Sequence, residues 1–152
     1  MLRTRFSEEL KESLKAKDQR AISTLRLILA ALKDRDIAAR GRGNKDGIGE
    51  EEVLQMLQTM IKQRRESIEM YTKGGRADLV AQEEGEIAII ERFLPKQLGE
   101  AEVSAAVAGL IGELGAGNIK DMGRVMAVLK ERYAGQIDMA KASAVVKQQL
   151  AK

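Results

Sequence analysis

The side chains best suited to contact another molecule are six cations near the end of the sequence. They lie on two expected helices and the segment just before them: Lys120, Arg124, Lys130, Arg132, Lys141 and Lys147. Cations so placed can contact phosphate groups, and the release of counterions would then supply affinity with little reading of base sequence. Cations on helix faces also serve simply as solvated surface. The residues alone leave both roles open and favour the second.

Gly123 lies next to Arg124 inside a helical pattern. Glycine in a helix costs roughly 1 kcal/mol relative to alanine. A glycine at such a position usually allows close approach of another backbone. We therefore expect either a packed helix or a ligand phosphate against Gly123.

A short basic run, Lys62–Arg65, falls within the expected third helix. Glu66 and Glu69 follow at a spacing of four residues from Lys62 and Arg65, which places each pair on one helix face. We expect structural ion pairs here.

The glycine-rich segment Arg40–Gly49 contains one Arg-Gly-Arg-Gly copy at its start. No aromatic residue is interleaved, so base stacking cannot contribute. No Gly-Lys-Ser or Gly-Lys-Thr follows, so the segment is no phosphate-binding loop. A mobile, solvated connection between helices is the favoured interpretation.

Four carboxylates cluster on the expected fourth helix, at Glu83, Glu84, Glu86 and Glu91. Helical di-metal sites combine such glutamates with histidine, which this chain lacks. A carboxylate-only Mg²⁺ site stays open as the lesser alternative. We expect these groups to solvate the surface and pair with nearby cations, and we expect no metal or other cofactor.

Three residue types that carry most enzyme chemistry or stacking are missing, because the 152 residues include no Cys, no His and no Trp. Their absence excludes a cysteine nucleophile, a Ser-His relay, a disulfide and an ordinary zinc site. The serines lie on expected helices and outside any glycine-rich elbow. They are Ser7, Ser13, Ser23, Ser67, Ser104 and Ser143. We therefore predict no catalytic residues.

The net charge of +3 hides a strong segregation along the chain. Residues 1–49 hold 12 basic and 7 acidic groups, whereas residues 50–94 hold 6 and 10. Residues 95–114 hold 1 and 3, and residues 115–152 hold 7 and 3. The N-terminal and C-terminal segments are thus the basic ones.

Apolar residues recur with helical period almost throughout, which predicts an all-α fold. Asp18 is suited to cap a second helix, and Lys73-Gly74-Gly75 is suited to end a third. Pro95 stops a fourth helix because the residue before proline leaves helical space. We expect a helical N-terminal domain of about four helices, residues 1–94, followed by a small three-helix domain, residues 95–152.

The longest apolar run, residues 27–32, is far shorter than a membrane span. The first six residues are not followed by an apolar signal core. We expect no membrane association and a cytoplasmic location.

Four motifs in order carry a resemblance to a known family. They are Lys62–Ser67, Tyr71 with Gly75–Leu79, Phe93–Leu98 and Asp121–Met126. Together they cover nearly the whole chain, which resembles a bacterial stand-alone member of the GatB/YqeY family. The resemblance implies a helical N-terminal domain followed by a three-helix domain.

The C-terminal part is similar to the tail domain of the B subunit of tRNA-dependent amidotransferase, the portion of that subunit that touches tRNA. The resemblance implies that the six cations contact the RNA backbone. It does not carry over the reaction, because the large catalytic domain of that enzyme and the Ser-Ser-Lys centre of its glutaminase have no counterpart here.

The leading hypothesis is a non-catalytic accessory protein that binds tRNA, with a tRNA-processing or amidotransferase protein as a second partner. Phosphate and shape contacts should dominate, because the chain has little aromatic surface for stacking. Two alternatives stay open: an accessory subunit that docks onto a protein, and a carbon–nitrogen ligase with glutamine as amido donor.

Overall fold

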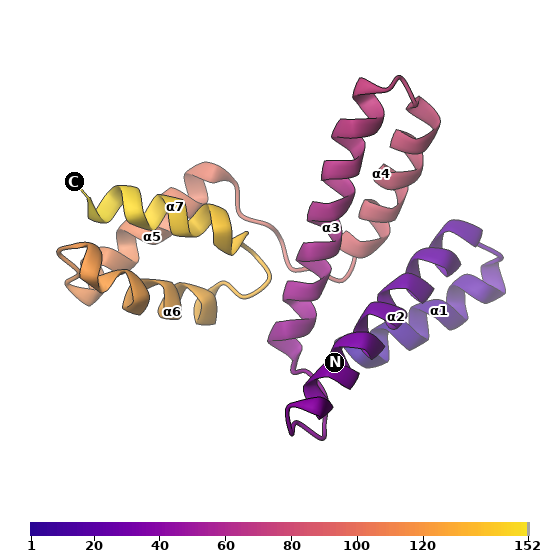
Figure 1. Cartoon of the computed structure of the whole chain (residues 1–152), viewed down its shortest axis with the longest axis horizontal. Helices are drawn as coiled ribbons and strands as arrows, with labels where there is room; N and C mark the ends of the chain where they lie inside the picture. The colour runs from indigo at the N-terminus through magenta and orange to yellow at the C-terminus, as the bar shows by residue number, and fades with distance from the viewer. Residues whose placement is uncertain (152) are drawn as a thin grey trace. The chain divides into compact units, whose positions relative to one another are not determined.

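The protein is all-α, as the periodicity predicts, and the computed structural model describes residues 1–151 (Figure 1). No β-strand occurs among these residues. The chain forms two compact units, one comprising Met1–Leu94 and one that starts at Pro95. Each unit has a hydrophobic core of its own.

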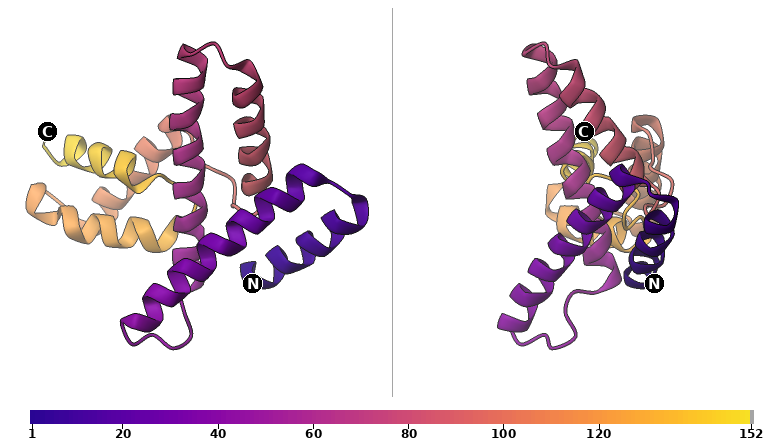
Figure 2. Two further views of the ribbon diagram at one scale, coloured as in Figure 1. Left: turned by 45° about the vertical axis from the view of Figure 1, so that its right-hand side comes forward. Right: turned by 90° about the vertical axis from the view of Figure 1, so that its right-hand side faces the viewer.

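The N-terminal unit consists of two helical hairpins. α1 (Leu2–Ala16) packs along α2 (Gln19–Gly41), and α3 (Glu50–Lys73) packs along α4 (Ala77–Glu91). Both views in Figure 2 show these two pairings. The hairpins meet mainly where α2 packs on α4.

Two aromatic rings close the core of this unit. Phe6 of α1 and Phe93, just after α4, meet edge to face with ring centroids 4.9 Å apart. Both side chains are buried. The guanidinium of Arg5 lies over the Phe93 ring at 5.2 Å, a cation–π contact. The first and last elements of the unit are thereby joined.

Local signals set the helix ends. The Asp18 carboxylate accepts a hydrogen bond from the Ala21 amide at 3.1 Å, which confirms the expected cap of α2. Gly75 has a φ of +71° just beyond α3, a conformation that glycine adopts without the usual steric cost.

The segment between α2 and α3 is exposed over most of its length, as expected for a solvated connection, but it is anchored near α3. α2 continues through Arg40 and Gly41, and the far end of the segment is anchored at Ile48, which is only 4% exposed. Asp36 accepts a hydrogen bond from the Ile48 amide at 2.9 Å. Gly47 serves this return to the core, because its φ is +82° and a Cβ there would clash with the Asp36 carboxylate.

The C-terminal unit is a three-helix bundle. Its elements are α5 (Glu100–Leu114), the short 3₁₀ helix η1 (Ile119–Asp121), α6 (Met122–Arg132) and α7 (Met139–Leu150). Each α-helix packs against the other two. The centre of the core is fully buried and contains Val107, Leu110, Val125, Leu129 and Val146.

Candidate nucleic-acid interface

The structure places all six predicted contact cations on the surface of the C-terminal unit. Lys120 lies in η1, Arg124 in the first turn of α6, Lys130 and Arg132 in its last turn, and Lys141 and Lys147 in the first and last turns of α7. All six side chains are exposed. The six cations thus lie in η1 and at both ends of α6 and α7.

These cations do not form one stripe. Arg124 and Lys130 are six residues apart, which separates them by about 120° around the axis of α6. The same spacing separates Lys141 from Lys147 on α7. A rigid, straight ligand could therefore meet only part of the set at once.

Arg132 is held by a carboxylate. Its two Nη atoms donate to the two carboxylate oxygens of Glu113 on α5, at 2.7 and 2.8 Å. This hydrogen bond lowers the pKa of Glu113 and raises the pKa of Arg132. Arg132 must give up this partner before it can bind a phosphate, so it is the weakest of the six candidates.

Arg124 has a looser partner. Its Nη2 lies 3.4 Å from Oδ1 of Asp121. Asp121 mainly serves the turn before α6: it accepts the Gly117 amide at 3.0 Å, a hydrogen bond that lowers its pKa. The Arg124 guanidinium can swing to a phosphate without unfolding that turn.

No described residue of another element packs against Gly123. A Cβ built on this residue would meet no heavy atom of another element within 4 Å. The packing interpretation of Gly123 is therefore wrong for residues 1–151, because none of their helices lies against it. Close approach from outside the molecule remains the other interpretation.

Charge is distributed unequally over the bundle. α5 carries Glu100, Glu102 and Glu113 and no cation. η1, α6 and α7 carry all six cations and two acids, Asp121 and Glu131. Asp121, and Asp138 just before α7, accept backbone hydrogen bonds at helix starts. The α6–α7 side is therefore the basic side of the unit.

The basic run of the N-terminal unit has a structural role, although its partners differ from those expected. Arg64 binds Glu86 of α4 at 2.8 Å, and Arg65 lies 3.5 Å from Glu91 of α4. The expected pairs within α3, from Lys62 to Glu66 and from Arg65 to Glu69, are not present among the described residues. The run joins α3 to α4.

The carboxylates of α4 divide into paired and unpaired groups. The Arg64–Glu86 pair is only 13% exposed at each side chain. Burial, with the nearby Glu86 as a lesser cause, raises the pKa of Glu83. Within residues 1–151 no group of three or more acidic side chains is arranged to hold a metal ion.

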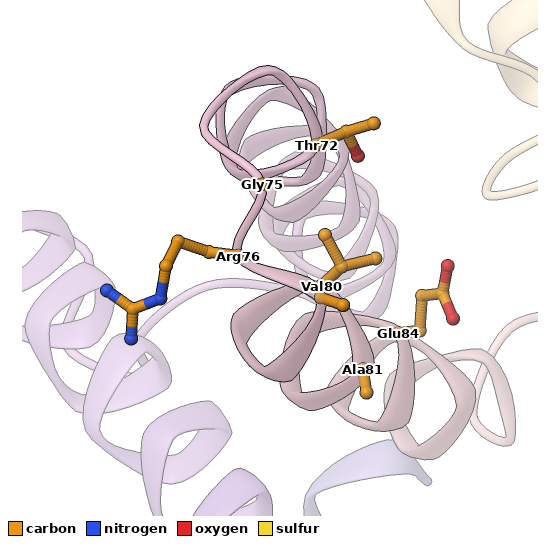
Figure 3. Close-up of a pocket in the computed structure, with 7 residues that line it drawn as sticks. Thr72, Gly75, Arg76, Val80, Ala81 and Glu84 are labelled. Atoms are coloured by element: carbon orange, nitrogen blue, oxygen red, sulfur yellow. The ribbon is translucent and has the colours of Figure 1, made fainter.

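Two hollows stand out, both in the N-terminal unit. The larger, about 320 Å³, lies at the turn between α3 and α4 and is lined by Thr72, Val80 and Glu84 among others. Figure 3 shows Arg76 extending away from Thr72 and Glu84. Arg76 instead binds Asp78 at 3.0 Å.

The smaller hollow, about 240 Å³, is lined by Arg35, Ala38, Arg42, Ile48 and Glu52. Neither hollow is lined by a serine or a lysine. Sequence reasoning missed this second hollow. The available signal was the seven-residue spacing of Arg35 and Arg42, which would place both on one face if the helix continued that far.

None of the helices in the described part of the chain is long and apolar enough to cross a membrane.

Known sequences resemble this chain over most of its length. A family model described as Yqey-like protein matches residues 3–150. The chain is 35% identical over 111 residues to altered inheritance of mitochondria protein 41, mitochondrial, of Lachancea thermotolerans, a match that covers 72% of this chain and 57% of the relative. It is 34% identical over 86 residues to the protein of that name from Saccharomyces cerevisiae strain YJM789, covering 57% of this chain and 44% of the relative.

A third relative of that name, from Eremothecium gossypii, is 33% identical over 89 residues, covering 59% of this chain and 46% of the relative. The matches thus span about half the length of these relatives. The relatives are named as mitochondrial, so they do not confirm the expected cytoplasmic location.

Proposed function

This chain belongs to the YqeY-like protein family, and from that premise we propose that it is a non-catalytic accessory protein that binds tRNA through its C-terminal unit. The unequal charge of that unit carries the proposal: six exposed cations lie on η1, α6 and α7, and α5 carries none. A polyanion would bind the α6–α7 side and avoid α5.

Phosphate groups are the target that this surface suits. Tyr133 is the one aromatic residue after Pro95 and is half-buried, so stacking on unpaired bases contributes little. Lys120, Lys141 and Lys147 make no ion pair with a described residue. They can exchange counterions for phosphates without losing an internal contact.

The lining of the two hollows supports the non-catalytic part of the proposal, because neither gathers a serine with a lysine. A glutamine-dependent ligase needs a nucleophile held in such a site. Glutaminase assay of the purified chain, with and without charged tRNA, checks this directly. Measurable turnover of glutamine would overturn the proposal.

Salt dependence of tRNA binding tests the contact mechanism. Each phosphate contact should contribute about 0.9 to the slope of log K against log salt between 50 and 200 mM. Arg124→Glu and Lys141→Glu should each weaken binding to different tRNAs by similar factors and reduce that slope. Lys96→Glu makes the same charge change in the same unit, outside η1, α6 and α7, and serves as the control.

The ion pair between Arg132 and Glu113 offers a second test. Glu113→Gln should release Arg132 for phosphate and tighten tRNA binding, and Glu102→Gln, also on α5, is its control. A slope near zero, or equal weakening by Lys96→Glu and Lys141→Glu, would show that the α6–α7 side is not the binding surface.

Docking onto a protein is the second candidate, supported by exposed apolar side chains of the N-terminal unit. Leu27 is 46% exposed and Ile37 is 53% exposed, both on α2, and Met70 of α3 is 72% exposed. A purified complex that survives nuclease and is lost on Ile37→Asp would favour this candidate over tRNA binding.

The proposal places this activity in the cytoplasm of a bacterial cell, where tRNA is available to a stand-alone protein. Fractionation of the source cells tests the location. Recovery in any other compartment would contradict it.

A further inference from the structure

The smaller hollow combines two arginines and one glutamate at the end of α2. Arg35 lines it from α2, Arg42 from the residue just after α2 and Glu52 from the first turn of α3. Ala38 lies between the two arginines in sequence. Figure 2 shows the chain turning back from the end of α2 to the start of α3. The hollow therefore lies where two helices and their connection meet.

The two arginines are among the seven of the thirteen in the sequence that make no ion pair with a described residue. Arg3, Arg64, Arg65, Arg76, Arg124 and Arg132 each bind a carboxylate. Arg35 is half-buried, yet neither it nor Arg42 makes an ion pair with any described residue. Even Glu52, on the wall of the same hollow, is paired with neither.

One lining residue of the hollow, Ile48, is buried and held by hydrogen bonds. Ile48 is 4% exposed, and its amide and carbonyl are bound by Asp36 at 2.9 Å and by Arg3 at 2.7 Å. Ala38 contributes only a methyl group, so the space between the arginines stays open. A ligand that enters would meet a backbone that is already in place at Ile48 and two arginine side chains with no ion pair among the described residues to give up.

We propose that the Arg35–Arg42–Glu52 hollow binds a phosphorylated ribose, with the phosphate on the two guanidinium groups and a ribose hydroxyl on the Glu52 carboxylate. Arginine matches phosphate geometry through paired N–H donors. A carboxylate at such a site selects hydroxyl donors and repels a second anion. The volume of about 240 Å³ is below the usual range of sites for larger ligands, which favours a single sugar phosphate unit.

The phosphorylated ribose could belong to a free nucleotide or to an RNA backbone. The Arg35–Arg42–Glu52 hollow lies in the N-terminal unit, whereas the proposed tRNA surface lies in the C-terminal unit. The inference therefore stands independently of the proposed function. Loss of binding here would leave the α6–α7 surface untouched, and the reverse also holds.

Titration of the full chain with ribose 5-phosphate, followed by amide chemical shifts in NMR, tests the site. We expect saturable shifts at residues around Ile48, weakened about tenfold by Arg35→Ala and by Arg42→Ala. Arg26→Ala, an exposed arginine on the same helix outside the hollow, should leave binding unchanged. Glu52→Gln should remove the preference for ribose 5-phosphate over 2-deoxyribose 5-phosphate while phosphate binding persists.

Parallel titrations with AMP and with tRNA separate the two sources. Tight binding of AMP with unchanged tRNA affinity in Arg35→Ala indicates a free nucleotide, and weakened tRNA binding in that variant indicates an RNA backbone. Absence of saturation by all three probes, equal loss in Arg26→Ala, or no difference between ribose and deoxyribose phosphates would overturn the proposal. Amide spectra of each variant establish that it is folded.

Discussion

Arg3 and Asp36 form a two-pronged ion pair that holds together three parts of the N-terminal unit. The Arg3 guanidinium donates to both Asp36 carboxylate oxygens at 2.7 and 2.8 Å, across 33 residues of sequence. Both side chains also bind the backbone of Ile48. α1, α2 and the segment just before α3 are thus joined through one pair of side chains.

Acid should remove the contribution of this pair. The Arg3 hydrogen bond is the main cause that lowers the pKa of Asp36 from 3.8 to about 2. A lowered folded-state pKa means that the stabilisation is complete above pH 4 and is lost as the pH falls towards 2. Asp36→Asn should therefore cost about 2 kcal/mol at pH 7, and less as the pH approaches 2.

Urea unfolding of the wild type and Asp36→Asn from pH 7 to pH 2 measures this difference. Asp34→Asn, an exposed aspartate on the same helix, is the control. A gap between wild type and Asp36→Asn that stays constant with pH would show that the Asp36 charge does not stabilise the fold.

The Arg64–Glu86 pair should matter more than the surface pairs. Removing one partner of a buried ion pair leaves the other charge uncompensated. Both side chains are 13% exposed, so Glu86→Ala should cost about 2 kcal/mol. Thermal unfolding should show little change for Glu84→Ala, whose side chain is exposed on the same helix; equal losses in both variants would contradict a special role for the pair.

Thr24 carries a buried hydroxyl without a hydrogen-bond partner among the described residues. The residue is fully buried on α2. Because an unsatisfied buried polar group is costly, Thr24→Val should raise the free energy of unfolding by about 1 kcal/mol. Thr24→Ser keeps the hydroxyl and loses a methyl group, so it should lower the free energy of unfolding. If Thr24→Val also lowers it, the Thr24 hydroxyl has a hydrogen-bond partner in the folded protein.

Replacing Gly123 should have opposite effects on the stability of α6 and on the affinity for tRNA. Its Cβ position is open, so Gly123→Ala should stabilise α6 by up to about 1 kcal/mol. If a phosphate approaches this backbone, the same change should weaken tRNA binding. Gly112→Ala, at an open position on the acidic helix α5, should also stabilise the fold and should leave the affinity for tRNA unchanged. If both variants bind tRNA with the same affinity, Gly123 has no part in binding.

The sequence by itself determined the helices and the side of each helix that is buried. Apolar period, the Asp18 cap and the glycine after α3 act within a few residues, so they can be read without knowing how helices pack. The six exposed cations follow from the same reasoning, because a polar position on an amphipathic helix faces water.

Only the tertiary structure decided which charges meet. Arg132 with Glu113, Arg64 with Glu86 and Arg3 with Asp36 are separated by 19, 22 and 33 residues. Local spacing indicates only neighbours on one helix. It therefore favoured pairs within α3, from Lys62 to Glu66 and from Arg65 to Glu69, which the described residues do not form. Ion pairs between helices, and the hollow formed at the end of α2, depend on how the helices cross, and packing of the cores sets that geometry.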